Sequence, residues 1–248
     1  MIRIVDLHKS FRSQKVLDGV NLEIEDGKTT VIIGRSGGGK SVLLKHIIGL
    51  LKPDSGQILV DDMDIVKLDD RELNEVRKKF GMLFQEGALF DSMNVAENVG
   101  FSLREHTKMK EDEIRAVVAE KLRAVGLAGI EEKMPSELSG GMRKRVALAR
   151  AIAINPQIVL FDEPTTGLDP IMLEAINQLI IDTQRNFGLT CIVISHDVES
   201  IFKIGHKIAM LYEGKIIEYG TPEEIRRSTN PVLQQFLTGS IEGPIQVL

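Results

Sequence analysis

Two segments near the start of the chain alternate apolar and polar residues. Ile2 to Leu7 and Val16 to Ile24 both follow a period of two, which predicts half-exposed strands. Between them, residues 10–14 form a polar stretch that we interpret as a loop with one aromatic residue, Phe11. That ring is able to stack on a base, but it would serve as well to cap a small sheet, and the spacing favours neither reading.

Uninterrupted apolar runs mark strands that are buried on both faces, as in a parallel sheet. The runs lie at residues 29–33, 80–84, 158–161 and 190–194. Helical spacing follows the first run at residues 42–49, and Asp69 to Lys79 reads as a charged amphipathic helix. A further helix is predicted from Pro170 to about Asn186, with Asp169 as its cap. Strands that alternate with helices in this way predict an α/β fold.

The pattern changes between Ala88 and about Ala153, where the strand signals stop. Glu111 to Val125 has a long helical pattern, and a second helix is predicted to begin near Ser139. We interpret residues 88–153 as a helical subdomain inserted into the mostly parallel core of a single domain, residues 1–240. The N-terminal strands form an antiparallel β subdomain of that domain.

Strand signals return towards the end of the chain. Lys207 to Tyr212 and Lys215 to Tyr219 flank Glu213-Gly214 and predict a hairpin. A short helix is predicted to start at Thr221. The tail from Asn230 is expected to be extended at its end, where residues 241–248 are available to dock on another surface.

The stretch Gly34 to Ser41 reads G-R-S-G-G-G-K-S and lies between a buried strand and a helix. It fits the P-loop pattern in the context that this motif requires. Glycines at 37–39 let backbone N–H groups face an anion, and the helix that follows adds its positive dipole end. Lys40 is expected to reach the β- and γ-phosphates, and the Ser41 hydroxyl is expected to ligate Mg²⁺. The motif predicts that this protein binds a nucleoside triphosphate.

The net charge and the cysteine content limit which binding partners and which cellular compartment are expected for this protein. The net charge of −5 provides no general attraction to nucleic acid. The single cysteine, Cys191, lies in an apolar run, so we expect a packed core thiol and a reducing compartment. No stretch of the sequence is apolar over a length that spans a bilayer. Work at a membrane is therefore expected to go through a partner.

Polar residues follow three of the predicted buried strands. They are Gln85, the pair Asp162 and Glu163, and His196. Ligands bind at the carboxyl ends of strands in open α/β sheets, so these side chains are candidates to hold Mg²⁺, to activate water and to contact a γ-phosphate. Polar loop residues also occur at such ends without a function, and a lone histidine there is usually structural.

A second glycine pair opens the helix after Leu138. Ser139 is a good N-cap, and Gly140 and Gly141 leave the first N–H groups of the helix bare. This helix end would bind an anion about a hundred residues away from the first anion site. A simple capped helix is the alternative, and the motif alone favours that alternative.

Taken in order, these motifs resemble those of the ATP-binding-cassette (ABC) ATPase family over essentially the whole chain. Residues 34–41 resemble Walker A, Gln85 the Q-loop, residues 138–141 the signature and residues 158–163 Walker B with its catalytic acid. Residues 168–169 resemble the D-loop and His196 the switch histidine. Phe11 stands where the family commonly has a tyrosine that stacks on adenine. Met142 replaces the commoner glutamine after the signature glycines, which leaves Ser139 intact.

The resemblance implies ATP and Mg²⁺ as cofactors and assigns roles to individual residues. The implied catalytic residues are Glu163, His196, Lys40 and Gln85. The implied nucleotide-binding residues are Phe11, Val16, Arg35, Ser36, Gly37, Gly38, Gly39, Lys40, Ser41, Val42, Ser139, Gly140, Gly141 and Asp169. The implied Mg²⁺ ligands are Ser41, Gln85 and Asp162.

The resemblance also accounts for two distant anion sites in one chain. In the family, two cassettes face each other head to tail, and each ATP lies between Walker A of one and the signature of the other. Segments at residues 87–107, 141–145, 235–237 and 242–244 are similar to a subgroup, the ATPase of the bacterial Mla (maintenance of lipid asymmetry) system and its MCE-linked relatives. That subgroup implies phospholipid transport between membranes. It also implies a homodimer under a multi-spanning permease at the cytoplasmic face of the inner membrane, and an MCE-domain lipid-binding protein as a further partner.

Three alternatives share part of this evidence. The same ATPase in another importer or exporter would carry amino acids or drugs, because the cassette itself does not touch cargo. A chromosome or repair ATPase would need long heptad arms or a basic stripe, and neither is visible. A nucleotide-binding scaffold without hydrolysis would be expected to lack the acid or the switch residue, and this chain has both Glu163 and His196.

Overall fold

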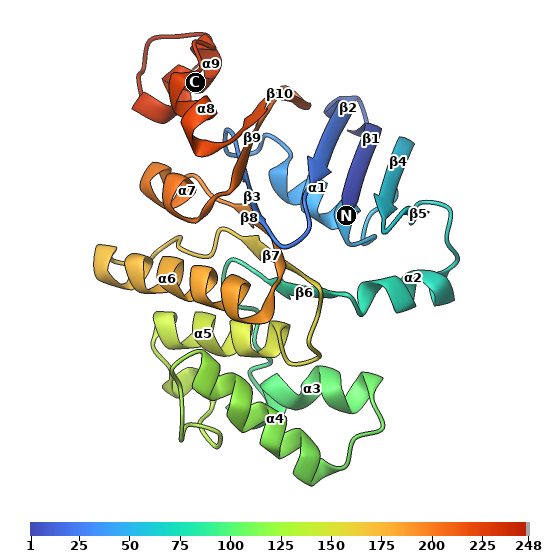
Figure 1. The fold of residues 1–248 in the computed structure, drawn as a ribbon, viewed down its shortest axis with the longest axis vertical. Coiled ribbons are helices and arrows are strands. Elements are labelled where there is room, and N and C mark those ends of the chain that lie inside the picture. Colours follow the sequence, from blue (N-terminus) through green and yellow to red (C-terminus); the bar gives the residue numbers. More distant parts are fainter. Residues whose placement is uncertain (247–248) are drawn as a thin grey trace. The chain divides into compact units, whose positions relative to one another are not determined.

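Two units make up the structure, a computed structural model that describes residues 1–246. The first unit contains Met1–Asn74 and Ile192–Leu248, and the second contains Glu75–Cys191. Figure 1 shows the order of their helices and strands along the chain. The last two residues of the expected tail lie outside the described residues. Within residues 1–246, no helix combines the length and the apolarity that a bilayer crossing requires.

An antiparallel sheet in the first unit has the strand order β2-β1-β4-β5. Its strands are β1 (Ile2–Phe11), β2 (Gln14–Ile24), β4 (Ser55–Val60) and β5 (Met63–Asp64). Ile2, Ile4 and Leu7 of β1 are buried, and the residues between them are more exposed, as the alternating pattern predicts. The two predicted N-terminal strands are therefore confirmed, and the sheet is the expected antiparallel β subdomain.

The loop predicted at residues 10–14 is wrong, because both strands continue into it. Phe11 pairs with Gln14, so the connection is a two-residue turn made of Arg12 and Ser13. Such a turn needs a positive φ, and Arg12 adopts φ 55° although it is not a glycine. The Ser10 N–H donates to Asp54 Oδ2 at 2.6 Å, which ties the hairpin to a segment that is remote in sequence.

The second sheet contributes three strands to the first unit, in the order β10-β9-β3. They are β3 (Thr29–Ile33), β9 (Lys207–Tyr212) and β10 (Lys215–Gly220), and β3 runs parallel to β9. All five residues of β3 are buried, as expected for a strand covered on both faces. The predicted hairpin of β9 and β10 is confirmed. The helices of this unit are α1 (Lys40–Ile47), α7 (Val198–Ile204), α8 (Pro222–Arg227) and α9 (Pro231–Thr238).

The second unit pairs β6 (Phe80–Leu83) and β7 (Ile158–Asp162) in parallel. Its helices are α3 (Val95–His106), α4 (Glu111–Ala124), α5 (Gly140–Ala151) and α6 (Pro170–Phe187), with a short 3₁₀ helix at Pro135–Glu137. Helices α3, α4 and α5 pack side by side (Figure 1). Two further elements, α2 (Asp70–Arg77) and β8 (Thr190–Ile194), include residues of both units. Parallel strand pairs and intervening helices confirm the predicted α/β class.

Two helices have clear start signals that the sequence analysis did not use. Asn94 caps α3 through the Glu97 N–H, and the Glu97 side chain accepts from the Asn94 N–H, so the pair forms a capping box. Asn230 caps α9, whose first residue is Pro231. The tail after Asn230 thus begins as a helix. After it, the Gln235 side chain bonds to the backbone of Ser240 and Ile245.

A buried amide holds the segment that precedes α3. The Asn98 side chain is fully buried, its oxygen accepts from the Phe90 N–H at 2.8 Å, and its nitrogen donates to the carbonyls of Phe90, Met93 and Asn94. Asn98→Ala removes the partner of several backbone groups at once. We expect the free energy of unfolding to fall by about 2–4 kcal/mol, measured by urea denaturation followed by circular dichroism.

Asn186→Ala is the matched control for this substitution. Asn186 is exposed near the end of α6, so its loss is expected to change the unfolding free energy by less than about 0.5 kcal/mol. Equal effects of the two substitutions would contradict the role given to Asn98.

Candidate functional site

The loop between β3 and α1 depends on glycine at specific positions. Gly34, Gly37 and Gly39 have φ values of 146°, 74° and 95°, in the region that other residues rarely adopt. A Cβ on Gly34 would collide with the Leu211 carbonyl, and one on Gly39 would lie 2.9 Å from Val16 Cγ1. The backbone therefore follows a path that side chains would block, which is the cradle predicted from the sequence.

Lys40 lies inside this loop and is only 5% exposed. Its Nζ donates to the carbonyls of Gly34 at 2.8 Å and of Arg35 at 2.9 Å, so the ammonium braces the loop from within. Helix α1 begins at Lys40, and its N-cap, Gly39, has no side chain to occupy the first N–H groups. Arg35, Ser36, Gly37 and Ser41 are exposed, Gly38 and Val42 are partly buried. A positive charge and the N-terminal amides of α1 thus lie at one short stretch of chain.

A hollow of about 430 Å³ lies beside the loop, within the first unit. Its walls come from the loop, from the start of β2 and from the tip of the β9–β10 hairpin: Gln14, Lys15, Val16, Arg35, Ser36, Gly37, Gly38, Leu211, Tyr212, Glu213 and Gly214. The structure therefore brings Val16 together with the predicted phosphate loop. Phe11 does not line the hollow. It lies at the tip of the β1–β2 hairpin, 44% exposed, with Lys9 Nζ 5.5 Å from its ring centre.

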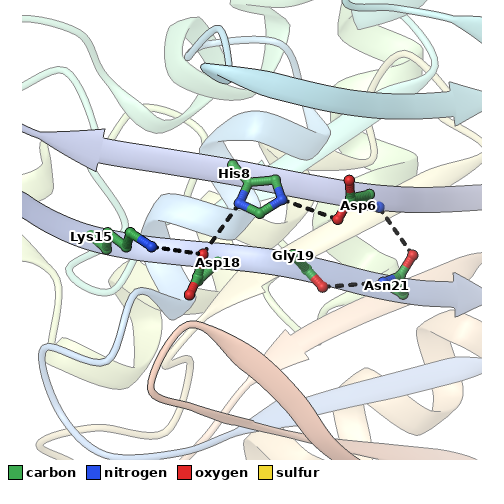
Figure 2. A network of polar contacts seen from close by, with 6 residues as sticks. All are labelled: Asp6, His8, Lys15, Asp18, Gly19 and Asn21. Atoms are coloured by element: carbon green, nitrogen blue, oxygen red, sulfur yellow. Dashed lines mark hydrogen bonds and ion pairs between the residues drawn. The ribbon is translucent and has the colours of Figure 1, made fainter.

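A polar network fixes the register of the hairpin that carries Phe11 and Val16 (Figure 2). His8 lies between two carboxylates, with Nε2 3.0 Å from Asp6 Oδ1 and Nδ1 3.3 Å from Asp18 Oδ1. Asp6 adopts φ 47° at a register shift in β1, where Asn21 accepts from its N–H. The Asp18 N–H donates to the carbonyl of Gly214, at the tip of the β9–β10 hairpin. These contacts hold two walls of the hollow together.

Asp54 anchors the tip of the same hairpin. Hydrogen bonds from the Lys9 ammonium and the Ser10 N–H hold the pKa of the Asp54 carboxyl below its usual range. The folded state therefore gains stability from this ionised carboxylate above its unfolded pKa and loses it as the pH falls through the lowered folded value. Because the carboxylate is half-exposed, solvent screens its charge, and we assign to Asp54 the role of positioning the tip of the hairpin.

In the second unit, β6 ends in a turn closed by the Gly87 N–H, which donates to the Phe84 carbonyl at 2.8 Å. Gln85 is exposed on this turn. Arg150, on α5, donates to the carbonyls of Gly87 at 2.8 Å and Ala88 at 2.9 Å. Burial lowers the pKa of Arg150. Helix α5 therefore holds the segment that follows Gln85.

A smaller hollow of about 270 Å³ lies next to this turn, within the second unit. Four phenylalanines line it, and two of them, Phe84 and Phe90, are substantially exposed. The Phe90 ring packs against Phe101 and lies 5.7 Å from the Arg150 guanidinium. An exposed aromatic surface of this kind is typical of interaction sites.

The signature helix α5 begins as the sequence predicts. Ser139 is its N-cap and accepts from the Met142 N–H at 3.3 Å. A Cβ on Gly140 would meet no atom within 4 Å, whereas one on Gly141 would run into Met172 on α6. Gly140 therefore faces open space at the start of the helix, as an anion site requires, and Gly141 allows the close approach of α6.

The end of β7 carries the predicted acids Asp162 and Glu163. Glu163 adopts φ 48°, a left-handed conformation that costs energy for a residue with a side chain. The Thr166 hydroxyl donates to Glu163 Oε2 at 3.1 Å. Lys144, on α5, donates to the carbonyls of Pro164 and Thr166, both at 2.7 Å. The turn that carries the candidate catalytic acid is thus held by two side chains that sequence reasoning missed.

Asp169 and His196 lie in loops that precede helices. The Asp169 carboxylate caps α6 through the N–H groups of Ile171 and Met172, both at 3.0 Å, so the predicted cap is confirmed. His196 is exposed between β8 and α7. Asp197 follows it and caps α7 through the Ser200 N–H at 2.7 Å. The backbone on both sides of the histidine is therefore ordered.

The candidate residues divide between the two units. Phe11, Val16, residues 34–42 and His196 belong to the first, whereas Gln85, residues 139–141, residues 162–163 and Asp169 belong to the second.

A signal for Lys144 was present in the sequence, because it shares the apolar side of α5 with Ala147 and Ala151 at helical spacing. No local pattern points to the role of Arg150.

Comparisons with known proteins agree with these motifs. The ABC transporter family matches residues 17–166. A probable ribonucleotide transport ATP-binding protein from Mycobacterium leprae is 47% identical over 98% of this chain and 70% of its own length. The intermembrane phospholipid transport system ATP-binding protein MlaF from Haemophilus influenzae is 46% identical over 99% of this chain and 93% of its own.

A solved structure has the same fold. The ATP-binding cassette MJ0796, described as dimeric in a post-hydrolysis state bound to ADP and Pi, superposes with a TM-score of 0.82. The two are 33% identical, and the match covers 90% of this chain and 99% of the cassette. Family match, sequence identity and fold agree, and this chain belongs to the ABC transporter family.

Proposed function

We propose that this chain is the ATP-hydrolysing subunit of a membrane transporter that moves phospholipid between bacterial membranes. The observation that carries the proposal is the similarity to MlaF, which extends over 99% of the chain. It includes the phosphate loop, the signature helix and the acid after β7 in family order. Two copies act together, and each ATP lies between the phosphate loop of one and the signature of the other.

The loop at residues 34–41 fits a triphosphate. A Cβ on Gly34, Gly38 or Gly39 would meet neighbouring atoms at 2.9 Å or less, and the N-terminus of α1 has no side-chain cap. Such a helix end stabilises anions through its free N–H groups and its dipole. With ATP bound, the Lys40 ammonium would donate to phosphate oxygens, and Val16, which lines the hollow beside the loop, would contact the nucleotide.

A hard cation suits the oxygen donors that the family resemblance assigns to Mg²⁺, one from the first unit and two from the second. Ser41, Gln85 and Asp162 offer a hydroxyl, an amide and a carboxylate, which are oxygen ligands that Mg²⁺ accepts together with phosphate and water. Bound Mg²⁺ would neutralise charge on the β- and γ-phosphates. Glu163 orients or deprotonates the attacking water, and His196 contacts the γ-phosphate. Lys40 stabilises the charge that develops as the terminal phosphate leaves.

Gly39→Ala tests the cradle. Its methyl group would meet Val16 and would force alanine to φ 95°, so we expect ATP binding to weaken by at least about ten-fold. Fluorescence anisotropy with a labelled ATP analogue measures this directly. Gly27→Ala is the control, because Gly27 has a similar positive φ of 65° but no atom within 4 Å of its Cβ position. Comparable weakening in both variants would show that strain alone explains the result.

The signature helix explains why two copies are needed. Ser139 and Gly140 lie at a second helix N-terminus, in addition to that of α1. In the arrangement that the family uses, each triphosphate contacts α1 of one subunit and this second helix end of the other subunit. Closure on ATP and opening after hydrolysis then drive the transporter as a ligand-dependent population shift.

Glu163→Gln is expected to trap the dimer. The amide keeps the shape of the side chain but cannot act as a base, so Mg-ATP binds, the two copies associate and hydrolysis falls by at least about 100-fold. Size-exclusion chromatography with light scattering measures the dimer, and phosphate release measures turnover. Full turnover in this variant would remove Glu163 from its role.

The double variant Glu163→Gln with Ser139→Arg is the matched control. Arginine at the signature helix start blocks the facing triphosphate, so the ATP-dependent dimer is expected to disappear. ATP binding to the single subunit is expected to stay within about two-fold, because the phosphate loop is untouched. A large loss of binding by the monomer would contradict the facing arrangement.

The membrane partners complete the proposal. The aromatic hollow lined by Phe84, Phe90 and Phe101 is a suitable seat for a multi-spanning permease, because exposed aromatic rings are enriched in binding surfaces. Its place next to Gln85 would link the permease to the ATP site. An MCE-domain lipid-binding protein is the further partner, and the complex places this chain peripherally on the cytoplasmic face of the inner membrane.

Co-purification of the tagged chain from membranes, with mass spectrometry of bound proteins and lipids, tests the cargo. We expect a permease, an MCE-domain protein and phospholipid in the complex, and Phe90→Asp is expected to reduce permease recovery by at least about ten-fold. Recovery of a permease with amino acids or drugs as cargo would favour the alternative transporter assignment. A soluble complex without a permease would overturn the transport role.

A further inference from the structure

Lys144 is a lysine in the interior of the second unit. It lies on α5, five residues after the cap Ser139, and is 6% exposed. Its Nζ donates to the carbonyls of Pro164 and Thr166, both at 2.7 Å. Lysine is almost never buried to this degree unless its ammonium is paired. The side chain therefore has a specific attachment point, the turn that follows β7.

That turn controls the orientation of Glu163. The Thr166 N–H donates to the Glu163 carbonyl at 3.3 Å, and the Thr166 hydroxyl donates to Glu163 Oε2 at 3.1 Å. Thr166 is itself held by Lys144 through its carbonyl. A continuous set of hydrogen bonds thus runs from helix α5 to the carboxylate that we place at the attacking water.

The energetics favour a positioning role over a purely stabilising one. Burial lowers the pKa of Lys144, and the negative charge of Glu163 opposes the shift. Buried charges of this kind contribute little net stability compared with an apolar side chain of similar size. What the lysine adds is a fixed distance between α5 and the turn. That distance matters because Glu163 is held in a left-handed conformation that costs energy.

We propose that Lys144 is a positioning residue that ties Glu163 to the signature helix and so couples the two ATP sites of the dimer. The inference rests on the proposed function, in which the N-terminus of α5 contacts the ATP of the facing subunit while Glu163 acts on the ATP of its own. Five helical residues, about 7.5 Å, separate Ser139 from Lys144. A shift of α5 as it seats on one nucleotide is transmitted through Lys144 to the acid at the other.

Lys144→Met tests this coupling in the full-length chain. Methionine keeps the length and apolar stem but donates no hydrogen bond, so we expect the turn to lose its hydrogen bonds to α5. The expected result is a kcat lower by about 10- to 100-fold, with KM for ATP within about three-fold of wild type. The Hill coefficient for ATP is expected to lie above 1 in wild type and to fall to 1 in the variant. Lys144→Arg, which again donates to both carbonyls, is expected to recover at least part of kcat and of the Hill coefficient.

Lys121→Met is the matched control. Lys121 is an equally buried lysine, 2% exposed on α4, but it bonds to the side chains of Asn155 and Glu120 and lies over the Phe187 ring, away from the Glu163 turn. Its loss is expected to lower Tm while kcat per folded molecule stays at the wild-type value. Thr166→Val provides a second test that keeps the lysine and removes only the hydroxyl bond to Glu163, and it is expected to lower kcat as well.

The outcomes separate the inference from the proposed function. If Lys144→Met and Thr166→Val hydrolyse ATP with wild-type kcat and Hill coefficient, while Glu163→Gln is inactive and dimeric, only the role of Lys144 is overturned. The same holds if kcat falls equally in the Lys144 and Lys121 variants at equal loss of Tm. If Glu163→Gln retains turnover, the proposed function fails, whatever the Lys144 variants do.

Discussion

The glycine N-cap of α1 is the constraint on which the phosphate loop depends. Helices α3, α5, α6, α7, α8 and α9 each have an Asn, Ser, Asp or Thr N-cap whose side chain accepts from the first N–H groups. Helix α1 begins at Lys40, and its N-cap, Gly39, has no side chain to do this. Groups left without an internal partner are costly to bury but bind an anion well. The contrast follows directly from residue type, since glycine is required there for both the backbone path and the open helix end.

Helix α5 carries out three tasks that follow from where its polar residues lie. Ser139 caps its N-terminus, Lys144 holds the turn after β7, and Arg150 holds the segment after Gln85. Buried apolar residues from Val146 to Ala149, with Ala151, pack the helix against its neighbours, so the three polar groups are held on one rigid helix. In the coupling that we propose, a shift of its N-terminus would reach the acid turn and the Gln85 turn together. This is the type of two-ended element that coupling between sites requires.

Much of the fold could be predicted because its signals are local. The buried run of β3, the glycine spacing of residues 34–41 and the capped start of α6 are each encoded within a few neighbouring residues, and the structure has all three. Two equally local signals were present but unused, the capping box at Asn94 and the Asn230-Pro231 pair. The helices they start, α3 and α9, were therefore not predicted individually, although α3 lies in the segment expected to be helical.

What could not be predicted depends on contacts between residues far apart in sequence. The β1–β2 turn has no glycine, and the hairpin is held by Asp54, which lies more than forty residues away. Lys144 and its carbonyl partners are about twenty residues apart, and a sequence does not show which backbone carbonyls a lysine will reach. Its position on the apolar side of α5 was the available sign, because a charge there must find a buried partner or shift its pKa. A charged residue on a buried helix face is therefore a reason to look for a positioning contact, and here the contact is with the carbonyls of Pro164 and Thr166, in the turn that follows Glu163.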